Sequence, residues 1–321
     1  MTGMKITLGH LYPDLMSAYG DRGNVETILR RCSWRGIATD VVHLRLGDRI
    51  RPGELDLIVI GSGGESRQAM VASDLAEIKG PDIREAVEQG AAALAVGTGY
   101  ELFGLSCQCR DGTELPGAGL FDAWTVRRRS ALGGNYGRVT EAQADRAIGE
   151  LTVRWGDTLL VGFENHSGGT YLGQTAQPLG QVICGYGNCG DGREGVQLRS
   201  AIGTNLRGPC LPKNPLLADF LIRAALARRH NAADLPPLPD ELEQAAHQAA
   251  VQRARQPVRG LASRAASIVL DRSVRRPGSA TAPRLRSAGL RRDHDQRPDG
   301  HVAGPANDGA SERRLLSGRG R

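Results

Sequence analysis

The apolar residues of the first hundred positions fall into short runs separated by longer stretches of helical spacing. Strands alternating with helices in this order are typical of a parallel sheet that helices cover on both faces. The predicted fold class is therefore α/β, with a mostly parallel sheet and flanking helices. Strands are predicted at Lys5–Leu11, residues 38–46 and Leu57–Ile60, and helices at residues 16–35 and 65–88, where Gly80-Pro81 marks a candidate break.

The chain turns sharply at the end of the next apolar run. Residues 92–96 are Ala, Leu and Val only, and a helical pattern follows from residue 98. Gly97 and Gly99 permit the tight backbone, and the close approach of helix to strand, that such a turn requires. Hydrolases hold a nucleophile at this kind of turn, but glycine has no side chain. The sequence thus predicts the scaffold of an active site without its reactive atom.

After this turn the pattern changes to short strands joined by glycine-rich turns. Because ligands of open α/β sheets bind beyond the carboxyl ends of the strands, residues 61–64, the turn at Gly97 and the segment after Ile202 are expected on one rim. Residues 61–64 lack the lysine of a phosphate-binding loop and fit an oxyanion or substrate loop better. Further strands are predicted at residues 117–126, 159–163, 179–186 and 195–202, followed by a helix from Asn214-Pro215 to about residue 229.

Composition divides the chain into three regions. Residues 1–232 are predicted to form one domain, and residues 233–255 a proline-rich linker with a short helix. Residues 256–321 mix Arg, Ala, Gly, Pro and Ser without an aromatic residue. Such a segment buries too little apolar surface to offset its ordering entropy, so a disordered tail is expected.

The positive charge of the chain belongs to this tail. From Val251 onward there are 16 arginines, no lysine and 6 acidic residues, or +10 formal charges, whereas the first 250 residues hold 25 basic and 29 acidic residues, or −4. Counterion release could let the tail bind nucleic acid or anionic lipid. However, arginine replaces lysine throughout the chain, and a GC-rich coding sequence or translation out of frame explains that bias. We therefore expect no specific nucleic-acid binding.

The six cysteines do not suggest a disulfide framework or a metal site. The chain begins without a signal-peptide pattern, so a cytoplasmic location with reduced thiols is expected. No run of about 18 apolar residues is present, so no transmembrane segment is predicted. The spacings fit no paired zinc motif, and no cysteine lies at a strand-to-helix turn, so structural roles are expected. They are Cys32, Cys107, Cys109, Cys184, Cys189 and Cys210.

Three segments together resemble a known family. They are Val-Gly-Thr-Gly-Tyr-Glu-Leu-Phe-Gly at 96–104, Gly-Phe-Glu-Asn-His-Ser-Gly-Gly-Thr-Tyr at 162–171 and Ile-Gly-Thr-Asn-Leu-Arg-Gly-Pro-Cys-Leu-Pro-Lys-Asn-Pro at 202–215. They resemble the class I glutamine amidotransferases of the cobyric-acid-synthase (CobB/CobQ) type, which have a flavodoxin-like architecture. Within these they are most similar to the glutaminase subunits (GatD type) of lipid II isoglutaminyl synthases. Segments 11–14, 19–24 and 111–117 support the resemblance, which covers about residues 4–230.

The resemblance implies a specific chemistry. A cysteine thiolate at the turn attacks the side-chain amide of glutamine, backbone N–H groups hold the oxyanion, and a histidine transfers the proton. The released ammonia passes to a Mur-ligase-like partner in a heterodimer. That partner uses ATP and Mg to amidate the α-carboxylate of D-glutamate in lipid II, so no cofactor or metal is expected in this chain.

This chain departs from the family pattern at its reactive positions. Gly97 stands where the family has its cysteine, and Arg207 stands where it has its histidine. An arginine stays charged and cannot serve as the general base. Ala131, or its neighbour Arg129, falls at the substrate-orienting arginine. Because loss of the nucleophile in a triad enzyme costs on the order of 10⁶ in rate, we expect little or no glutamine hydrolysis.

The remaining candidate residues keep more than one interpretation. Gly63, Thr98 and Gly99 are candidates for oxyanion or substrate binding, and His166 is either a substituted base or a hydrogen-bonded structural residue. The first hypothesis is a glutaminase subunit with a compromised centre. The second is an inactive pseudo-amidotransferase that serves as scaffold or regulator of a ligase using free ammonia. A cobyrinate- or dethiobiotin-type homologue is less favoured, because no ATP-binding domain precedes the amidotransferase segments.

Overall fold

The computed structural model describes residues 3–127, 146–231 and 234–255. These residues all belong to one compact unit. The arginine-rich tail predicted at 256–321, and the candidate residue Ala131, lie outside the described residues.

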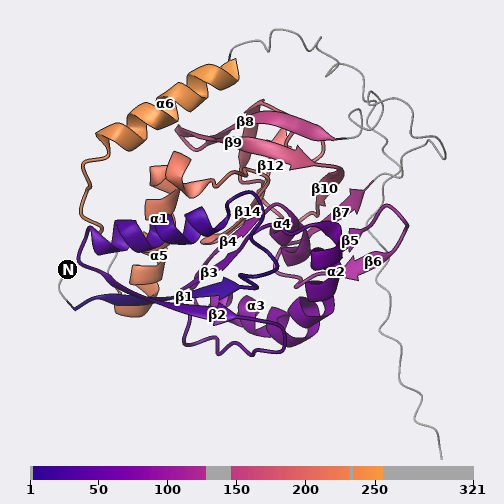
Figure 1. The fold of residues 1–321 in the computed structure, drawn as a ribbon, viewed down its shortest axis with the longest axis horizontal. Coiled ribbons are helices and arrows are strands. Elements are labelled where there is room, and N and C mark those ends of the chain that lie inside the picture. Colours follow the sequence, from indigo (N-terminus) through magenta and orange to yellow (C-terminus); the bar gives the residue numbers. More distant parts are fainter. Residues whose placement is uncertain (1–2, 128–145, 232–233, 256–321) are drawn as a thin grey trace, which may run out of the picture. The chain divides into compact units, whose positions relative to one another are not determined.

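A six-stranded sheet forms the centre of this unit (Figure 1). Five strands pair in parallel, and only the edge strand β13 is antiparallel to its neighbour β14. This arrangement confirms the predicted α/β class. In spatial order the strands are β13 (Val196–Leu198), β14 (Ala201–Thr204), β4 (Ala92–Val96), β3 (Leu57–Ile60), β1 (Lys5–Leu11) and β2 (Ala38–Leu44).

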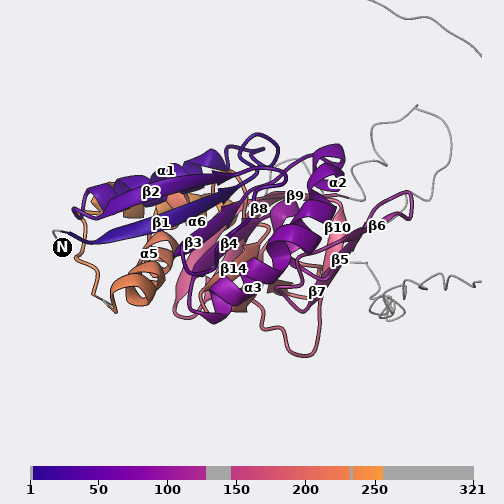
Figure 2. The same ribbon diagram turned by 90° about the horizontal axis from the view of Figure 1, so that it is seen from below.

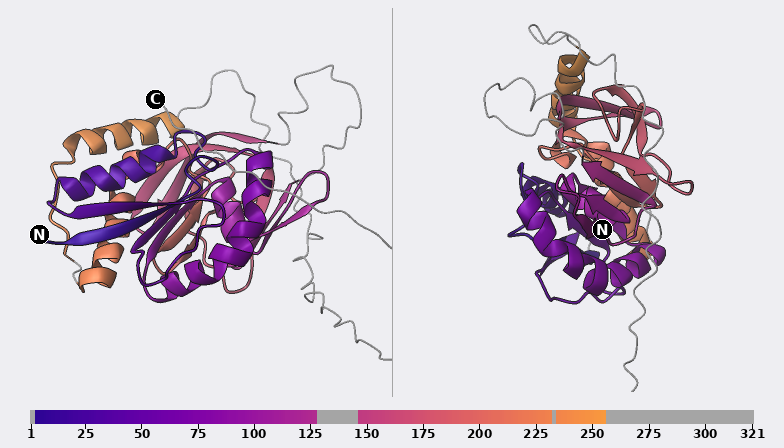
Figure 3. Two further views of the ribbon diagram at one scale, coloured as in Figure 1. Left: turned by 60° about the horizontal axis from the view of Figure 1, so that its bottom comes forward. Right: turned by 90° about the vertical axis from the view of Figure 1, so that its right-hand side faces the viewer.

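Helices cover both faces of the sheet, as predicted, because alternate strand residues point to opposite sides. Leu57 and Val59 pack with helices α1 and α5, whereas Ile58 and Ile60 pack with α2 and α3. Figures 2 and 3 show the strands between these two helical layers. The helix bounds are α1 (Arg22–Ser33), α2 (Glu65–Ser73), α3 (Gly80–Glu88) and α5 (Pro215–His230).

Two predicted helices differ from the observed ones. The first begins at Arg22 rather than at residue 16, because the chain before it turns through positive φ at Tyr12 (47°) and Tyr19 (57°). The second is not broken at Gly80-Pro81: a π-helical segment, Asp74–Lys79, joins α2 directly to α3. Pro81 lies in the first turn of α3, where a missing N–H is tolerated.

Two small sheets are inserted between β4 and β14. Their strands β5, β6, β8, β10 and β12 were not predicted, and the single strand predicted at 195–202 is two antiparallel strands that turn at Arg199 (φ 53°). One sheet contains β10 (Gly168–Leu172), β7 (Ala123–Arg127), β5 (Ser106–Gln108) and β6 (Glu114–Pro116). The other contains β12 (Arg193–Glu194), β11 (Gly180–Cys184), β8 (Ala147–Trp155) and β9 (Thr158–His166).

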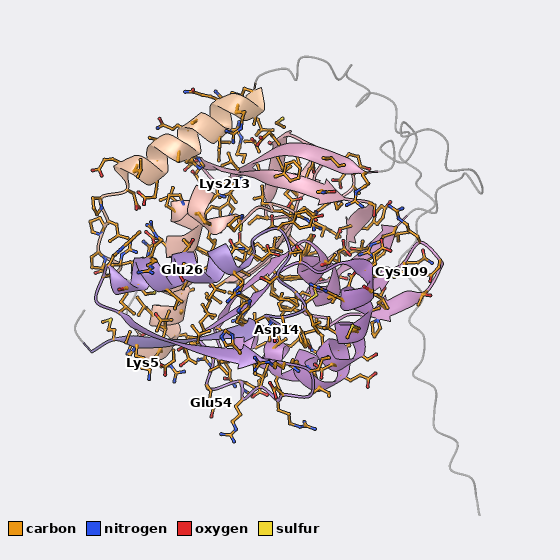
Figure 4. All side chains as sticks on the ribbon, viewed as in Figure 1. Lys5, Asp14, Glu26, Glu54, Cys109 and Lys213 are labelled. Carbon is orange, nitrogen blue, oxygen red and sulfur yellow. The ribbon has the colours of Figure 1, made fainter. Side chains whose placement is uncertain are left out.

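The last described segment, residues 234–255, is attached to the rest by polar contacts. Its helix α6 (Glu241–Arg255) lies beside β8 and β9 (Figure 1). The guanidinium of Arg31, whose side chain is 3% exposed, donates to both Asp219 and Asp240 at 2.7–2.8 Å. His247 Nδ1 lies 2.7 Å from the carbonyl oxygen of Lys213, which Figure 4 labels below α6. These contacts attach the start of the segment and the middle of α6 to the rest of the domain.

Across the described ranges, no helix combines the length and apolar character needed to cross a membrane. The same ranges hold no group of three His, Cys, Asp or Glu side chains placed to bind a metal ion.

Candidate functional site

The predicted strand-to-helix turn is present at Gly97. This residue joins β4 to helix α4 (Thr98–Phe103) with φ 57° and ψ −117°, a conformation that strains any residue with a side chain. Its N–H donates to the carbonyl oxygen of Thr204 on β14 (2.8 Å). A Cβ at Gly99 would lie 2.5 Å from the Gly61 carbonyl oxygen, so this close approach requires glycine. The sheet therefore holds the turn from both neighbouring strands.

The three segments predicted on one rim do meet there. Gly63 N–H donates to Thr98 Oγ1 (2.7 Å), and that hydroxyl donates to the Gly63 carbonyl oxygen (3.1 Å), which fastens loop 61–64 to the turn. Arg207 follows β14 and approaches the turn from the other side. The segments enclose a cavity of about 480 Å³. It is lined by Ala18, Tyr19, Gly63, Gly64, Glu65, Thr98, Glu101, Arg127, Arg146, Asn165, His166, Ser167 and Arg207.

The guanidinium of Arg207 occupies the space that a side chain at position 97 would need. A Cβ built on Gly97 would lie 2.5 Å from Arg207 Cζ, 2.6 Å from Nη2 and 2.5 Å from Ser62 Oγ. Carbon atoms in contact prefer about 3.5–4.0 Å, so all three distances are clashes. Gly97 and Arg207 are therefore in direct contact, and the absence of a side chain at position 97 leaves room for the guanidinium.

The guanidinium of Arg207 is buried and has no hydrogen-bonding partner among the described residues. It is 3% exposed, and its Cζ lies 5.2 Å from the centre of the Tyr19 ring. Burial lowers the pKa of Arg207, although the charges of Glu101, Tyr19 and Asp21 oppose that shift. Within the described part of the chain no atom accepts a hydrogen bond from this guanidinium, and its buried Nε is unsatisfied. The cavity thus contains a buried cation whose donors are available.

A second arginine lies beside the turn and is paired. Arg127, from β7, donates to Glu101 Oε2 (2.5 Å) and to Gln68 Oε1. Gln68 donates in turn to Glu101 (2.9 Å). Burial alone would raise the pKa of Glu101, but Arg127, Gln68 and Arg207 hold it below its usual value. Glu101 lies within the motif at 96–104, but its ion pair was not predicted, because its partners Arg127 and Gln68 come from two distant segments.

His166 is held by hydrogen bonds at both ring nitrogens. Nδ1 lies 2.9 Å from the Gly168 carbonyl oxygen, and Nε2 lies 3.4 Å from Glu164 Oε2. Burial lowers the pKa of His166, but the contact with Glu164 and the Gly168 carbonyl outweighs this and raises it. Glu164 also accepts from the N–H groups of Tyr186 (2.6 Å) and Gly187 (3.0 Å). This geometry favours the structural interpretation of His166, since a base needs a free ring nitrogen.

The described cysteines lie away from the cavity beside the turn. Of the described residues that line the cavity, none is a cysteine. Cys107 is fully buried, and burial and the nearby Glu101 raise its pKa far above the usual value. Burial also raises the pKa of Cys109, which Figure 4 labels at the end of the unit where β5 and β6 lie. Ser62 Oγ donates to the Val96 carbonyl oxygen (3.1 Å) in the buried turn.

Sequence comparison places this arrangement in a family. Residues 7–215 match the CobB/CobQ-like glutamine amidotransferase domain. The chain belongs to this family. The resemblance found in the three motifs is confirmed, and the α/β fold agrees with the class I amidotransferase architecture.

Two curated relatives of this amidotransferase carry one name, lipid II isoglutaminyl synthase (glutamine-hydrolyzing) subunit GatD. The Staphylococcus aureus (strain N315) protein is 33% identical over 253 residues, which cover 78% of this chain and 96% of that protein. The Streptococcus pneumoniae (strain ATCC BAA-255 / R6) protein is 29% identical over 244 residues, covering 75% and 88%. A solved structure of PurLQS from Thermotoga maritima covers 70% of this chain and 98% of its own, with 12% identity and a TM-score of 0.44.

In this amidotransferase the candidate residues occupy distinct places. Gly63, Thr98, His166 and Arg207 line the cavity, while Gly97 and Gly99 form the turn beside it. The structure therefore brings together every described candidate residue.

Proposed function

We propose that the protein is the glutaminase-type subunit of a lipid II isoglutaminyl synthase in which its own centre no longer hydrolyses glutamine. The proposal rests on the two GatD relatives, whose lengths this chain covers almost completely. A Mur-ligase-like partner in a cytoplasmic heterodimer would bind ATP and Mg and amidate D-glutamate in the peptidoglycan precursor. The partner would take free ammonia from solution, and this chain would act as its scaffold or regulator.

The observation that carries the proposed loss of hydrolysis is the position of Arg207. Hydrolysis of glutamine in this family needs a thiolate and a proton acceptor within hydrogen-bonding reach of each other. Here a guanidinium fills the space next to Gly97 that the nucleophile would occupy. It also stands at the position of the base, where its permanent charge prevents proton acceptance. Among the described residues, the site therefore has neither a nucleophile nor a proton acceptor beside the turn.

The test is an assay of the chain in complex with its partner ligase. Glutamate release from glutamine and amidation of the precursor are measured with glutamine or with ammonium chloride as nitrogen source. We expect amidation with ammonium and no glutamine hydrolysis above background. Glutamine-dependent turnover would contradict the proposal, because another residue would then supply the nucleophile.

Two variants provide the matched control. The double variant Gly97→Cys with Arg207→His restores both reactive groups and removes the clash, so it is expected to recover glutamine hydrolysis. Arg207→His alone lacks the nucleophile and is expected to stay inactive, on the order of 10⁶ below a competent enzyme. If the double variant folds but remains inactive, the departure extends to further positions such as Thr98, Gly169 or Ala131.

A further inference from the structure

We infer that the cavity beside Gly97 binds a small dicarboxylic amino acid such as glutamate, with Arg207 holding the side-chain carboxylate. The inference rests on the proposed loss of glutamine hydrolysis, because only without a nucleophile does the guanidinium remain at the turn. It concerns equilibrium binding, which is measured without turnover.

The positive charge of Arg207 is buried and has no hydrogen-bonded counter-charge among the described residues. A buried charge is strongly destabilising unless an opposite charge and hydrogen bonds compensate for it. The guanidinium is 3% exposed, and in the described residues no atom accepts its hydrogen bonds. The Tyr19 ring, at 5.2 Å, supplies only a cation–π contact. An anion entering the cavity would provide the missing acceptors.

Two carboxylates near Arg207 already accept hydrogen bonds from other groups. Glu101 is paired with Arg127 and accepts from Gln68. Asp21 Oδ2 accepts from the N–H of Ser62 (2.6 Å). Neither carboxylate accepts a hydrogen bond from Arg207, and a ligand carboxylate in the cavity would supply these acceptors.

The other charges along the cavity match an amino acid with two carboxylates. Arg146, which donates to Asn165 at 2.6 and 3.1 Å, and Arg127, whose Nη1 lacks a hydrogen bond within the described ranges, provide further positive charge. The Glu65 carboxylate forms an ion pair with Arg127 Nη1 (3.6 Å), but its side chain is 54% exposed and could also contact an ammonium group. The volume of about 480 Å³ lies within the usual range for small-molecule sites.

The same geometry discriminates against glutamine. A carboxylate presents two acceptor oxygens to the two-pronged guanidinium, and this pairing is strong because both groups are charged. The side-chain amide of glutamine presents one oxygen and one NH₂ group, and that NH₂ would face guanidinium donors. The cavity is therefore expected to favour glutamate at least tenfold over glutamine.

Isothermal titration calorimetry of the full chain tests this with L-glutamate, L-glutamine and inorganic phosphate as separate ligands. We expect glutamate to bind at least tenfold more tightly than the other two. Arg207→Gln should weaken glutamate binding at least tenfold and abolish the preference over glutamine. Arg207→Lys, which keeps the charge without the fork, should bind with intermediate affinity. The exposed Arg154→Gln variant is the matched control and should bind glutamate like wild type.

Three results would overturn the inference. These are no glutamate binding by the wild-type chain at millimolar concentration, unchanged affinity in a folded Arg207→Gln variant, and phosphate binding as tight as glutamate binding. Circular dichroism checks the fold of each variant. If Arg207→Gln does not fold, the affinity of Arg207→Lys for glutamate is compared with that of wild type instead. Since no partner or turnover is involved, a failure here leaves the ammonium assay of the complex interpretable on its own.

Discussion

A side chain at position 97 would compete with Arg207 for the same space above the turn. The turn itself survives because Gly97 is hydrogen-bonded to Thr204 and Gly99 packs on Gly61. Its left-handed backbone is thus maintained by the sheet and does not depend on a catalytic side chain. The sequence predicted the turn but not the contact, because the path of a long side chain depends on its rotamers and on neighbours from distant segments.

Gly97→Ala tests the packing of Arg207 over the turn. Gly156→Ala is the matched control, since Gly156 has almost the same φ (56° against 57°) and a Cβ at that position would have no atom within 4 Å. Both variants place a side chain at positive φ, and only the first also clashes with the guanidinium of Arg207 and with Ser62 Oγ. In urea unfolding we expect Gly97→Ala to be less stable than Gly156→Ala by about 1–3 kcal/mol. Equal losses would show that Arg207 does not occupy this space in solution.

Asp21 is expected to make stability depend on pH. Burial raises its pKa to about 6, against the hydrogen bond from Ser62 and the charge of Arg207. The folded state therefore holds this proton more tightly than the unfolded state, whose pKa is about 3.9, and stability falls as pH rises between these values. Above pH 6 this loss of unfolding free energy is complete and amounts to at most about 3 kcal/mol.

Asp21→Asn should accordingly be more stable than wild type at pH 8, with the difference closing near pH 4. Urea unfolding at pH 4, 6 and 8 measures it, and Asp157→Asn, in an exposed turn, is the control. A difference that is constant with pH would exclude the proposed titration.

At the level of elements, the buried strands were predicted best. Lys5–Leu11 and Leu57–Ile60 have the bounds that the apolar pattern indicated, because a strand buried on both faces consists of apolar residues. Strands such as β5, β6 and β10 were missed, since they are only three to five residues long and owe their conformation to the strands with which they pair. For such strands pairing decides the structure and local pattern does not.

The contact between Asp240 and Arg31 is expected to hold α6 against the rest of the domain. Asp240 shares the buried guanidinium of Arg31 with Asp219, so Asp240→Asn removes one charged contact and leaves the other intact. Hydrogen exchange of residues 234–255 should become at least severalfold faster, while α1 and α5 keep their protection. The exposed Asp234→Asn is the control. Unchanged exchange would mean that the Arg31–Asp240 contact does not hold α6.

At the level of the whole molecule, topology explains why the site could be anticipated. The carboxyl ends of parallel strands meet at one edge, so loop 61–64, Gly97 and Arg207 were expected together and are found together. The Glu101–Arg127 pair could not be anticipated, because it joins helix α4 to a strand of an inserted sheet. Nothing in the local pattern specifies which insertion residues face the turn.

Removal of residues 256–321 tests the charge of the arginine-rich region. The shortened chain loses 14 arginines and 6 acidic residues. If this region has no dedicated partner, both forms should show the same weak binding to DNA and anionic vesicles at physiological salt, by fluorescence anisotropy and co-sedimentation. A strong, steeply salt-dependent affinity that disappears with the truncation would instead identify an anion-binding role.

The pairing of β14 with β4 has a consequence for the order of folding. It joins Ala201 to Ala93 and is the most distant pairing in the large sheet. Closing so long a loop costs chain entropy before any contact compensates, and such contacts are typically slow to form. Gly97 follows β4 and Arg207 follows β14. The guanidinium and the turn therefore meet only when this pairing is made. During synthesis the cavity cannot form until β14 has left the ribosome.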